Sequence, residues 1–331
     1  MRTILAGTRS GVYRVDSDGP TFLGLDGERI SAMMVVQREV QPARIIAGSY
    51  ESGMFRSDDL GQTWQEVTNG FTLSCVRWLG PDPLNAGALL VGTEPGRIFR
   101  SSDQGKSWNE LSGIREIPGY EKWYLPYSPR AGAVRNIYSP PDSQTCFASV
   151  EVGGLLISED AGESWRCEFV GADSDIHYVT GHPVEKPLLF AALGYAGIDH
   201  SPNDSPDHRG GLARSTDGGR TWTKLFGDYT RGVIIPSSNP EIVLAGPSPN
   251  VGRHGRIEVS NDQGSTWESA STGIKTPMED MVESFLETPD GRVWAICSGG
   301  TLLESKTDEI RWSPVPGTEH LDVDSVAFLN D

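Results

Sequence analysis

The chain contains ionisable residues that recur in similar strand-like surroundings at wide intervals. When the repeats described below are laid over one another, one position reads Ser31, Arg77, Arg135, His177, Arg231, Glu283 and Asp324. Guanidinium groups that meet at one point can hold a carboxylate or phosphate through paired hydrogen bonds. A histidine beside them can exchange a proton near neutral pH. This ring therefore predicts a site for a small anionic molecule, with the three arginines as substrate-binding residues.

Carboxylates complete the predicted catalytic group. We expect His177 to act as the general acid or base, while Glu151, Glu283 or Asp324 orients it or serves as the second acid/base group. The same four side chains offer nitrogen and oxygen ligands, so a divalent metal is an alternative. No HExxH or HxxEH spacing supports zinc, and no other cofactor is indicated. A ring of salt bridges and water that only fills a channel is the competing interpretation.

An insertion over about residues 114–133 lengthens a loop that we place on the same face as the ring. It carries Trp123, Tyr124 and Arg130, which are candidates for stacking on and binding a substrate. For the aromatic residues, packing of the insertion onto the body of the protein is an equal alternative.

Two further insertions, over residues 194–211 and 247–255, contain His208 and His254. Long loops on one face of a rigid scaffold are common places for binding residues, so both histidines are substrate-binding candidates. For either one, simple exposure to solvent is the competing interpretation.

Five segments share the pattern Ser-x-Asp-x-Gly-x-Thr/Ser-Trp and identify the element that must position these residues. They begin at Ser57, Ser101, Ser158, Ser215 and Ser260, and a degenerate sixth copy begins at Ser305. In each, which we call a box, the Asp can accept backbone N–H groups across a tight turn, and the Gly supplies a positive φ. Apolar, β-rich runs flank the boxes, so each is predicted to be a hairpin turn between two strands.

Each box belongs to a unit with four strand-like runs, which is typical of a propeller blade. Residues 1–16 match the second and third strands of a unit, and residues 321–328 match a first strand. We therefore predict an all-β, seven-bladed β-propeller over residues 1–331, as a single domain. Its closing blade combines about residues 321–331 with 1–28, so strands from both termini close the ring. A six-bladed ring would leave both end strands unpaired.

The boxes resemble those of the BNR or Asp-box repeat propellers, a superfamily that includes sialidases, sortilin-type receptors, glucan-processing glycosidases and photosystem assembly factors. The resemblance extends over essentially the whole chain and implies the propeller fold, with the boxes on the face opposite the ligand site. It implies no single function, because the group contains enzymes, receptors and assembly factors. Sialidases carry an Arg-Ile-Pro motif near the start, which this chain lacks, so we do not expect a true sialidase.

Composition narrows the partners and the compartment. The formal net charge of −17 disfavours nucleic acid, and no apolar run is long enough to span a membrane. The start has no signal-peptide pattern and the four cysteines show no paired spacing, so we expect a cytoplasmic protein with reduced thiols. The sequence indicates nothing about oligomeric state.

These observations predict a cytoplasmic enzyme, a hydrolase or lyase, that acts on a small anionic or carboxylated molecule in the central funnel of the propeller. Two alternatives stay open. One is a non-catalytic propeller that binds a protein or ligand on the same face. The other is a glycosidase that uses two of the funnel carboxylates.

Overall fold

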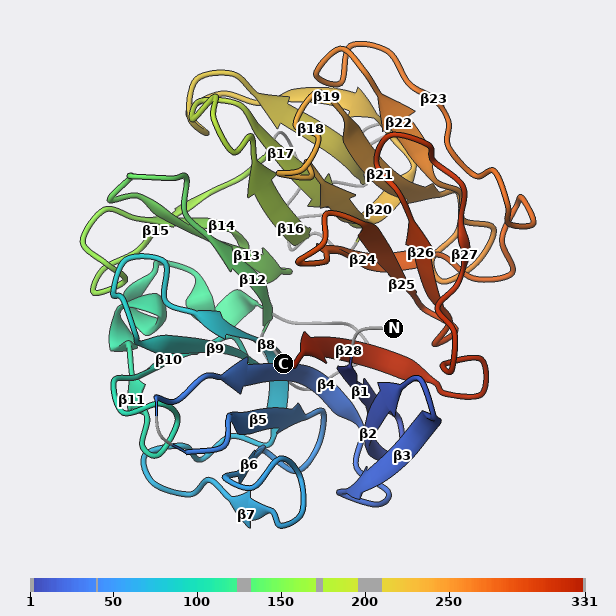
Figure 1. The fold of residues 1–331 in the computed structure, drawn as a ribbon. Coiled ribbons are helices and arrows are strands. Elements are labelled where there is room, and N and C mark those ends of the chain that lie inside the picture. Colours follow the sequence, from blue (N-terminus) through green and yellow to red (C-terminus); the bar gives the residue numbers. More distant parts are fainter. Residues whose placement is uncertain (1–2, 40, 124–131, 171–174, 196–209, 330–331) are drawn as a thin grey trace.

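A computed structural model describes residues 3–39, 41–123, 132–170, 175–195 and 210–329. Within these ranges the elements are β-strands, apart from two short 3-10 helices, η1 (Ser112–Glu116) and η2 (Tyr120–Lys122). The strands form seven four-stranded antiparallel sheets around a central axis (Figure 1). The prediction of an all-β, seven-bladed β-propeller is confirmed. No helix in the described ranges is long and apolar enough to cross a membrane.

We number the blades from the one that closes the ring. In each blade we give the strands in their order from the axis outwards. The innermost strands of blades 1 to 7 are β28 (Val323–Phe328), β4 (Ile30–Val36), β8 (Cys75–Pro81), β12 (Ala133–Tyr138), β16 (Ile176–Gly181), β20 (Tyr229–Ile234) and β24 (Val282–Glu287). The second strands are β1 (Ile4–Thr8), β5 (Arg44–Ser49), β9 (Leu89–Glu94), β13 (Cys146–Glu151), β17 (Leu189–Leu193), β21 (Val243–Ser248) and β25 (Val293–Cys297). The third strands are β2 (Gly11–Asp16), β6 (Met54–Ser57), β10 (Ile98–Ser101), β14 (Gly154–Ser158), β18 (Gly211–Ser215), β22 (Glu258–Ser260) and β26 (Leu302–Ser305). The outermost strands are β3 (Gly19–Gly24), β7 (Gln65–Glu66), β11 (Asn109–Glu110), β15 (Arg166–Glu168), β19 (Thr223–Phe226), β23 (Glu268–Ser269) and β27 (Ser313–Pro314).

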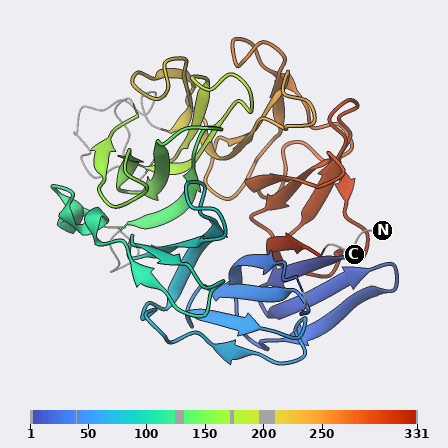
Figure 2. The ribbon, with the colours of Figure 1, turned by 60° about the vertical axis from the view of Figure 1, so that its left-hand side comes forward.

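Blade 1 joins the two ends of the chain. Strand β28 pairs antiparallel with β1, with Ile4 opposite Phe328 and Gly7 opposite Ser325. Figure 1 shows the red β28 beside the dark-blue β1, and Figure 2 shows both termini at this blade. Ring closure by strands from both ends, as the sequence predicted, pairs two edges that would otherwise be exposed.

Hydrophobic side chains gather between the blades. Seven buried clusters each combine residues of two consecutive sheets, one cluster at every blade interface. Between blades 2 and 3, for example, Ile46 of β5 packs in one cluster with Phe99 of β10 and Trp108. Small residues in the second strands permit close approach, since a Cβ on Gly48 would lie 2.3 Å from Val76 Cγ1. Blade spacing therefore depends on these apolar and small residues.

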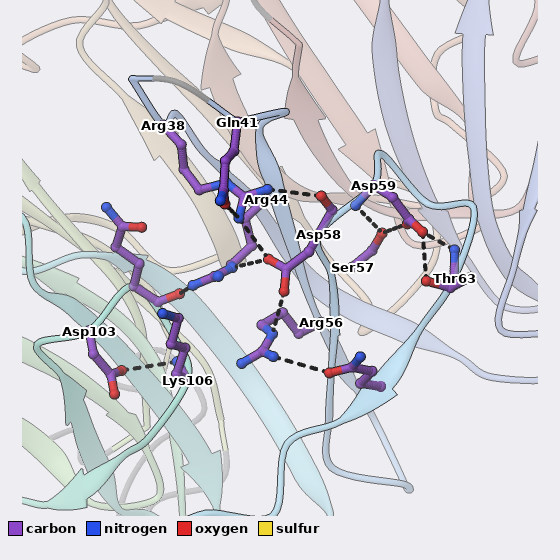
Figure 3. Close-up of polar contacts among 12 residues, drawn as sticks. Arg38, Gln41, Arg44, Arg56, Ser57, Asp58, Asp59, Thr63, Asp103 and Lys106 are labelled. Atoms are coloured by element: carbon purple, nitrogen blue, oxygen red, sulfur yellow. Dashed lines mark hydrogen bonds and ion pairs between the residues drawn. The ribbon is translucent and has the colours of Figure 1, made fainter.

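The boxes form hydrogen-bonded turns where the third strands end. In the first box, Ser57 Oγ accepts the Gly61 N–H at 2.8 Å and donates to Asp59 Oδ1 at 2.7 Å. Asp59 accepts the Thr63 N–H at 2.9 Å and the Thr63 hydroxyl at 2.6 Å (Figure 3). These bonds lower the pKa of Asp59 to about 2. The same bonds recur in the other four complete boxes.

The boxes lie at the opposite end of the blades from the starts of the inner strands. In blade 2, Ser57 at the end of β6 pairs with Ile45 at the start of β5, whereas Ile30 at the start of β4 pairs with Ser49 at the end of β5. The loops that follow the second strands therefore share a face with the starts of the inner strands, and the boxes occupy the other face.

Arginines fasten three of the boxes to the preceding blade. Arg44, Arg100 and Arg214 each donate to the carbonyl of the residue before the box Gly in the next blade. Arg44 also donates to Asp58, and Arg38 and Arg56 contact the same carboxylate (Figure 3). These contacts give the boxes a structural role that links neighbouring blades.

Candidate functional site

Every blade carries a β-bulge near the start of its innermost strand, at the position that the repeats align. In β8, Val76 pairs with Thr93 and Trp78 pairs with Gly92, which leaves Arg77 as the extra residue. A bulge re-aims the side chain that it carries. The bulge residues are Ser31, Arg77, Arg135, His177, Arg231 with Gly232, Glu283 and Asp324.

The seven ring residues all line one cavity of about 1160 Å³. The alignment of repeats did not say whether these side chains point to the axis or between the blades, and the bulges account for their convergence. Residues just before or at the start of the inner strands and at the ends of the second strands add further side chains, including Arg29, Glu94, Asp175 and Tyr229. The structure thus brings the predicted ring together, while the functions of its members stay predictions.

Arg77 connects two carboxylates on one side of the cavity. Its Nη1 lies 2.7 Å from Glu94, and its Nη2 lies 3.4 Å from Glu151. Nη1 also donates to the Tyr50 hydroxyl at 2.9 Å. The Arg77 side chain is therefore held by three partners.

Arg135 is less firmly held. Its Nη1 lies 3.3 Å from Glu151 and its Nη2 lies 3.6 Å from Glu283, and both distances are long for a charge-assisted hydrogen bond. Glu283 has a closer partner in Arg231, which donates to it. Within the described residues Arg135 has no further hydrogen bond, and its side chain is 17% exposed. Arg135 therefore keeps N–H donors available to a molecule in the cavity.

His177 is enclosed at the side of the cavity by Asp175 and Tyr229. Its Nε2 lies 2.9 Å from the Tyr229 hydroxyl and 3.4 Å from Asp175 Oδ1. Tyr229 also accepts a hydrogen bond from Arg231 Nε at 2.9 Å. Burial by itself lowers the pKa of His177, but the carboxylates of Asp175 and Glu151 outweigh it and raise the pKa above its ordinary value. The arrangement favours a protonated imidazole beside the cavity.

Asp324, which also lines the cavity, is shared by two arginines. Arg29 Nε lies 2.6 Å from its carboxylate, and Arg9 Nε lies 3.7 Å away. The guanidinium groups of Arg29 and Arg77 also lie over the Tyr50 ring, each 4.9 Å from its centre. Asp324, predicted as a catalytic residue, is therefore the ion-pair partner of Arg9 and Arg29.

The four side chains considered as metal ligands do not form one group. Within the described residues, the side chains close enough to share an ion are Glu151, Asp175 and His177, whose ligand atoms lie within 4.8 Å of one another. Glu283 and Asp324 instead pair with arginines. Two guanidinium groups also contact Glu151, and their charge opposes a cation there. The predicted set of four is therefore not brought together, and a metal held by Glu151, Asp175 and His177 stays a prediction.

Two of the candidates from the loop insertions are among the described residues, and neither of these joins the cavity. Trp123 is 2% exposed and belongs to the hydrophobic cluster between blades 3 and 4, so it packs the insertion and is not open to a substrate. His254 is exposed and does not line the cavity. Tyr124, Arg130 and His208 lie outside the described residues.

Asp175 and Tyr229 were missed by the sequence reasoning, although the repeats contained a signal for both. Each precedes a ring residue by two positions: Asp175 precedes His177, and Tyr229 precedes Arg231. The repeats align these two positions with one another, just as they align the ring residues. Extending the alignment by two positions would have identified both residues.

Comparison with known proteins finds likeness in structure only. No family model and no curated protein matches the chain. The GH74 xyloglucanase from Xanthomonas campestris has a TM-score of 0.67 and 17% identity, over 99% of this chain and 52% of that one. The GH74 enzyme from Niastella koreensis has a TM-score of 0.64 and 17% identity, and the match covers 98% of this chain and 52% of that enzyme's chain. YCF48 bound to D1 peptide has a TM-score of 0.56 and 18% identity, and the match covers 93% of this chain and 94% of the YCF48 chain.

These likenesses support the fold and leave the function open. The chain spans about half the length of the two GH74 enzymes and nearly the whole of YCF48. The neighbours thus include enzymes and a peptide-bound propeller, at identities that carry no activity across. Membership of the BNR or Asp-box superfamily is not confirmed, because no family model matches. What the structural neighbours do support is a seven-bladed β-propeller.

Proposed function

We propose that this propeller is a hydrolase or lyase that acts on a small anionic molecule, such as a carboxylate, in the central cavity. The observation that carries the proposal is Arg135, a guanidinium with open donors between two distant carboxylates. Such a group suits a carboxylate or phosphate that binds through two oxygens. Four arginines and five carboxylates line the cavity with His177, so its charge is nearly balanced. In a chain of net charge −17, an anion meets less repulsion here than over the rest of the surface.

His177 and Glu283 are the groups best placed to move protons. The raised pKa of His177 favours the imidazolium, which can give a proton to a leaving group and later take one back. Tyr229 stays a neutral phenol, because burial raises its pKa, and it bridges His177 and Arg231. The Glu283 side chain is 24% exposed, against 5% for Glu151, so Glu283 is the more accessible second acid/base group.

A ligand screen followed by matched variants tests the binding step. Carboxylates and sugar acids would be screened by thermal shift, and a hit would be titrated calorimetrically into wild type, Arg135→Ala and Arg214→Ala. Arg214 lies on β18, where it contacts the box of the next blade, and serves as the control. We expect Arg135→Ala to weaken binding by about 2–5 kcal/mol and Arg214→Ala to leave it unchanged. Equal binding by all three proteins would remove Arg135 from the site.

Catalysis needs a separate readout. If His177 moves a proton, His177→Gln should lower the turnover of a bound substrate by about 10²–10⁴-fold and change its affinity much less. Circular dichroism would first establish that the variant is folded. Turnover at the wild-type rate would contradict the role of His177.

A binding protein without catalysis is the second candidate, and the likeness to YCF48 favours it. That match covers nearly all of both chains, and the YCF48 structure contains a D1 peptide. In this case ligands or peptides would bind on the cavity face, and His177→Gln would change their affinity. Neither the wild type nor His177→Gln would convert a bound ligand to product.

The GH74 likeness favours a glycosidase as a narrower form of the hydrolase proposal. Glu151 and Glu283 would be its two carboxylates, since both contact Arg135 from opposite sides. A panel of aryl glycosides tests this form, and Glu283→Gln should abolish any release of the aryl group. Release that survives in Glu283→Gln would exclude Glu283 as one of the two.

A further inference from the structure

We infer that the molecule accepted by this cavity carries an apolar part beside its anionic group. The anionic part rests on the proposed function, and the apolar part rests on how residue types are distributed along the cavity. Among the described residues, the charged groups that line the cavity gather at one level. They are ring residues, residues two positions before the ring, or the last residues of second strands.

Past the ring, the inner strands present apolar side chains to the cavity. The lining residues that follow the bulges include Met33, Trp78, Tyr178, Phe285, Leu286 and Val326. In this stretch the polar side-chain groups of the described lining are the Tyr178 hydroxyl, the Trp78 indole N–H and the hydroxyls of Ser284 and Ser325. Ser325 is already used, because its hydroxyl donates to Ile30 O at 2.8 Å. The cavity therefore changes from charged to apolar along the direction of the inner strands.

Four of these six apolar side chains are partly open, although they belong to the innermost strands, whereas Met33 and Phe285 are buried. Trp78, Tyr178, Leu286 and Val326 are half-buried, whereas Val76, which packs between blades 2 and 3, is completely buried. Water gains few hydrogen bonds from such walls. An apolar group that covers them gains free energy in proportion to the area removed from water. Large apolar surface with convergent polar groups at one end is the usual construction of a small-molecule site.

The ligand class that fits is an amphipathic anion, a carboxylate with an aliphatic or aromatic tail. Its charged end would meet Arg135 in the ring, and its tail would extend along the inner strands toward the box face. A small hydrophilic acid would use the ring alone and leave the apolar walls uncovered.

Two homologous series test the tail. Straight-chain carboxylates from acetate to decanoate, and primary alcohols of the same lengths, would be titrated calorimetrically into the wild-type protein. We expect the dissociation constant of the carboxylates to fall about three- to fourfold per added CH₂ until the channel is filled. The heat-capacity change of binding should become more negative with length. A dissociation constant that does not change with carboxylate length overturns the inference.

The same titrations separate the tail from the head group. Carboxylates that bind more tightly than alcohols of equal length, and lose this advantage in Arg135→Ala, support the anion site. Equal binding of both series with a gain for each CH₂ supports the apolar channel and contradicts the proposed function. Carboxylate binding that Arg135→Ala weakens, without any gain from length, supports the proposed function and overturns the channel. Absence of binding in both series overturns both.

A variant that narrows the channel gives a second test. Val326→Trp adds bulk to a half-buried wall position and should weaken decanoate at least tenfold more than acetate. Leu286→Gln, which makes the wall polar with little change in size, should reduce the gain per CH₂ and covers the case in which Val326→Trp does not fold. Equal weakening of short and long carboxylates in both variants would contradict the inference.

Discussion

The buried pair of Asp175 and His177 predicts that Asp175→Asn lowers the free energy of unfolding by an amount that depends on pH. The two residues are 1% and 2% exposed, and His177 Nε2 lies 3.4 Å from Asp175 Oδ1. In the folded protein the pKa of His177 is raised above the ordinary value of 6.5. Its protonation therefore stabilises the fold fully below about pH 6.5, and this contribution is lost as the pH rises through the folded-state pKa.

Asp175→Asn should reverse that linkage. Asn has nearly the same size, so packing is kept while the charge that holds the proton is removed. Burial then dominates and lowers the pKa of His177. At pH 5 the buried imidazolium has lost its main partner, and we expect the free energy of unfolding to fall by about 3–5 kcal/mol. At pH 9 a larger share of the imidazole is neutral, and the loss should be about 1 kcal/mol, the value of one hydrogen bond.

Urea denaturation followed by tryptophan fluorescence measures both losses. Wild type, Asp175→Asn, His177→Gln and the double variant would be compared at pH 5, 7 and 9. The double-mutant cycle should give a coupling energy that is larger at pH 5 than at pH 9. A loss in Asp175→Asn that is equal at both pH values, or that grows with pH, would refute the reasoning, because it would mean that His177 is neutral in the folded protein.

Three further predictions concern the frame that holds the cavity. Ser101→Ala leaves the buried Gly105 N–H without its acceptor and should lower the free energy of unfolding by about 1–3 kcal/mol in urea, whereas no change would contradict the role of the box. Deletion of residues 321–331 removes β28 from its pairing with β1 and should lower the melting temperature sharply in calorimetry; a deletion variant as stable as the parent would refute ring closure as a source of stability. Hydrogen bonds from Thr221 lower the pKa of Asp217 to about 2, so its stabilising effect is present above about pH 4 and lost as the pH falls toward 2. The melting temperature should fall in that window, less steeply in Asp217→Asn, and this variant should keep wild-type ligand affinity.

The fold could be derived from the sequence because the box is a local structure. Its hydrogen bonds join residues no more than four apart, such as Ser57 with Gly61 and Asp59 with Thr63. Eight residues therefore carry all the information that the turn needs, and five copies reveal the blade. Ring closure could be predicted by counting strands, since each end of the chain supplied part of one unit. The ring positions followed as well, because equivalent positions in repeated units lie at equivalent places around the axis.

The direction and the partners of the ring side chains depend on the tertiary structure. Bulges at the starts of the inner strands direct these side chains into the cavity, and no residue type in the ring announces a bulge. Arg77 contacts Glu94 and Glu151, which lie 17 and 74 residues away in sequence. Whether such groups meet depends on the angles between blades, which the hydrophobic clusters at seven interfaces set together. Pattern reasoning therefore identified which positions converge. Packing between blades decided which charges pair, and it placed Arg135 at 3.3 Å from Glu151 and 3.6 Å from Glu283.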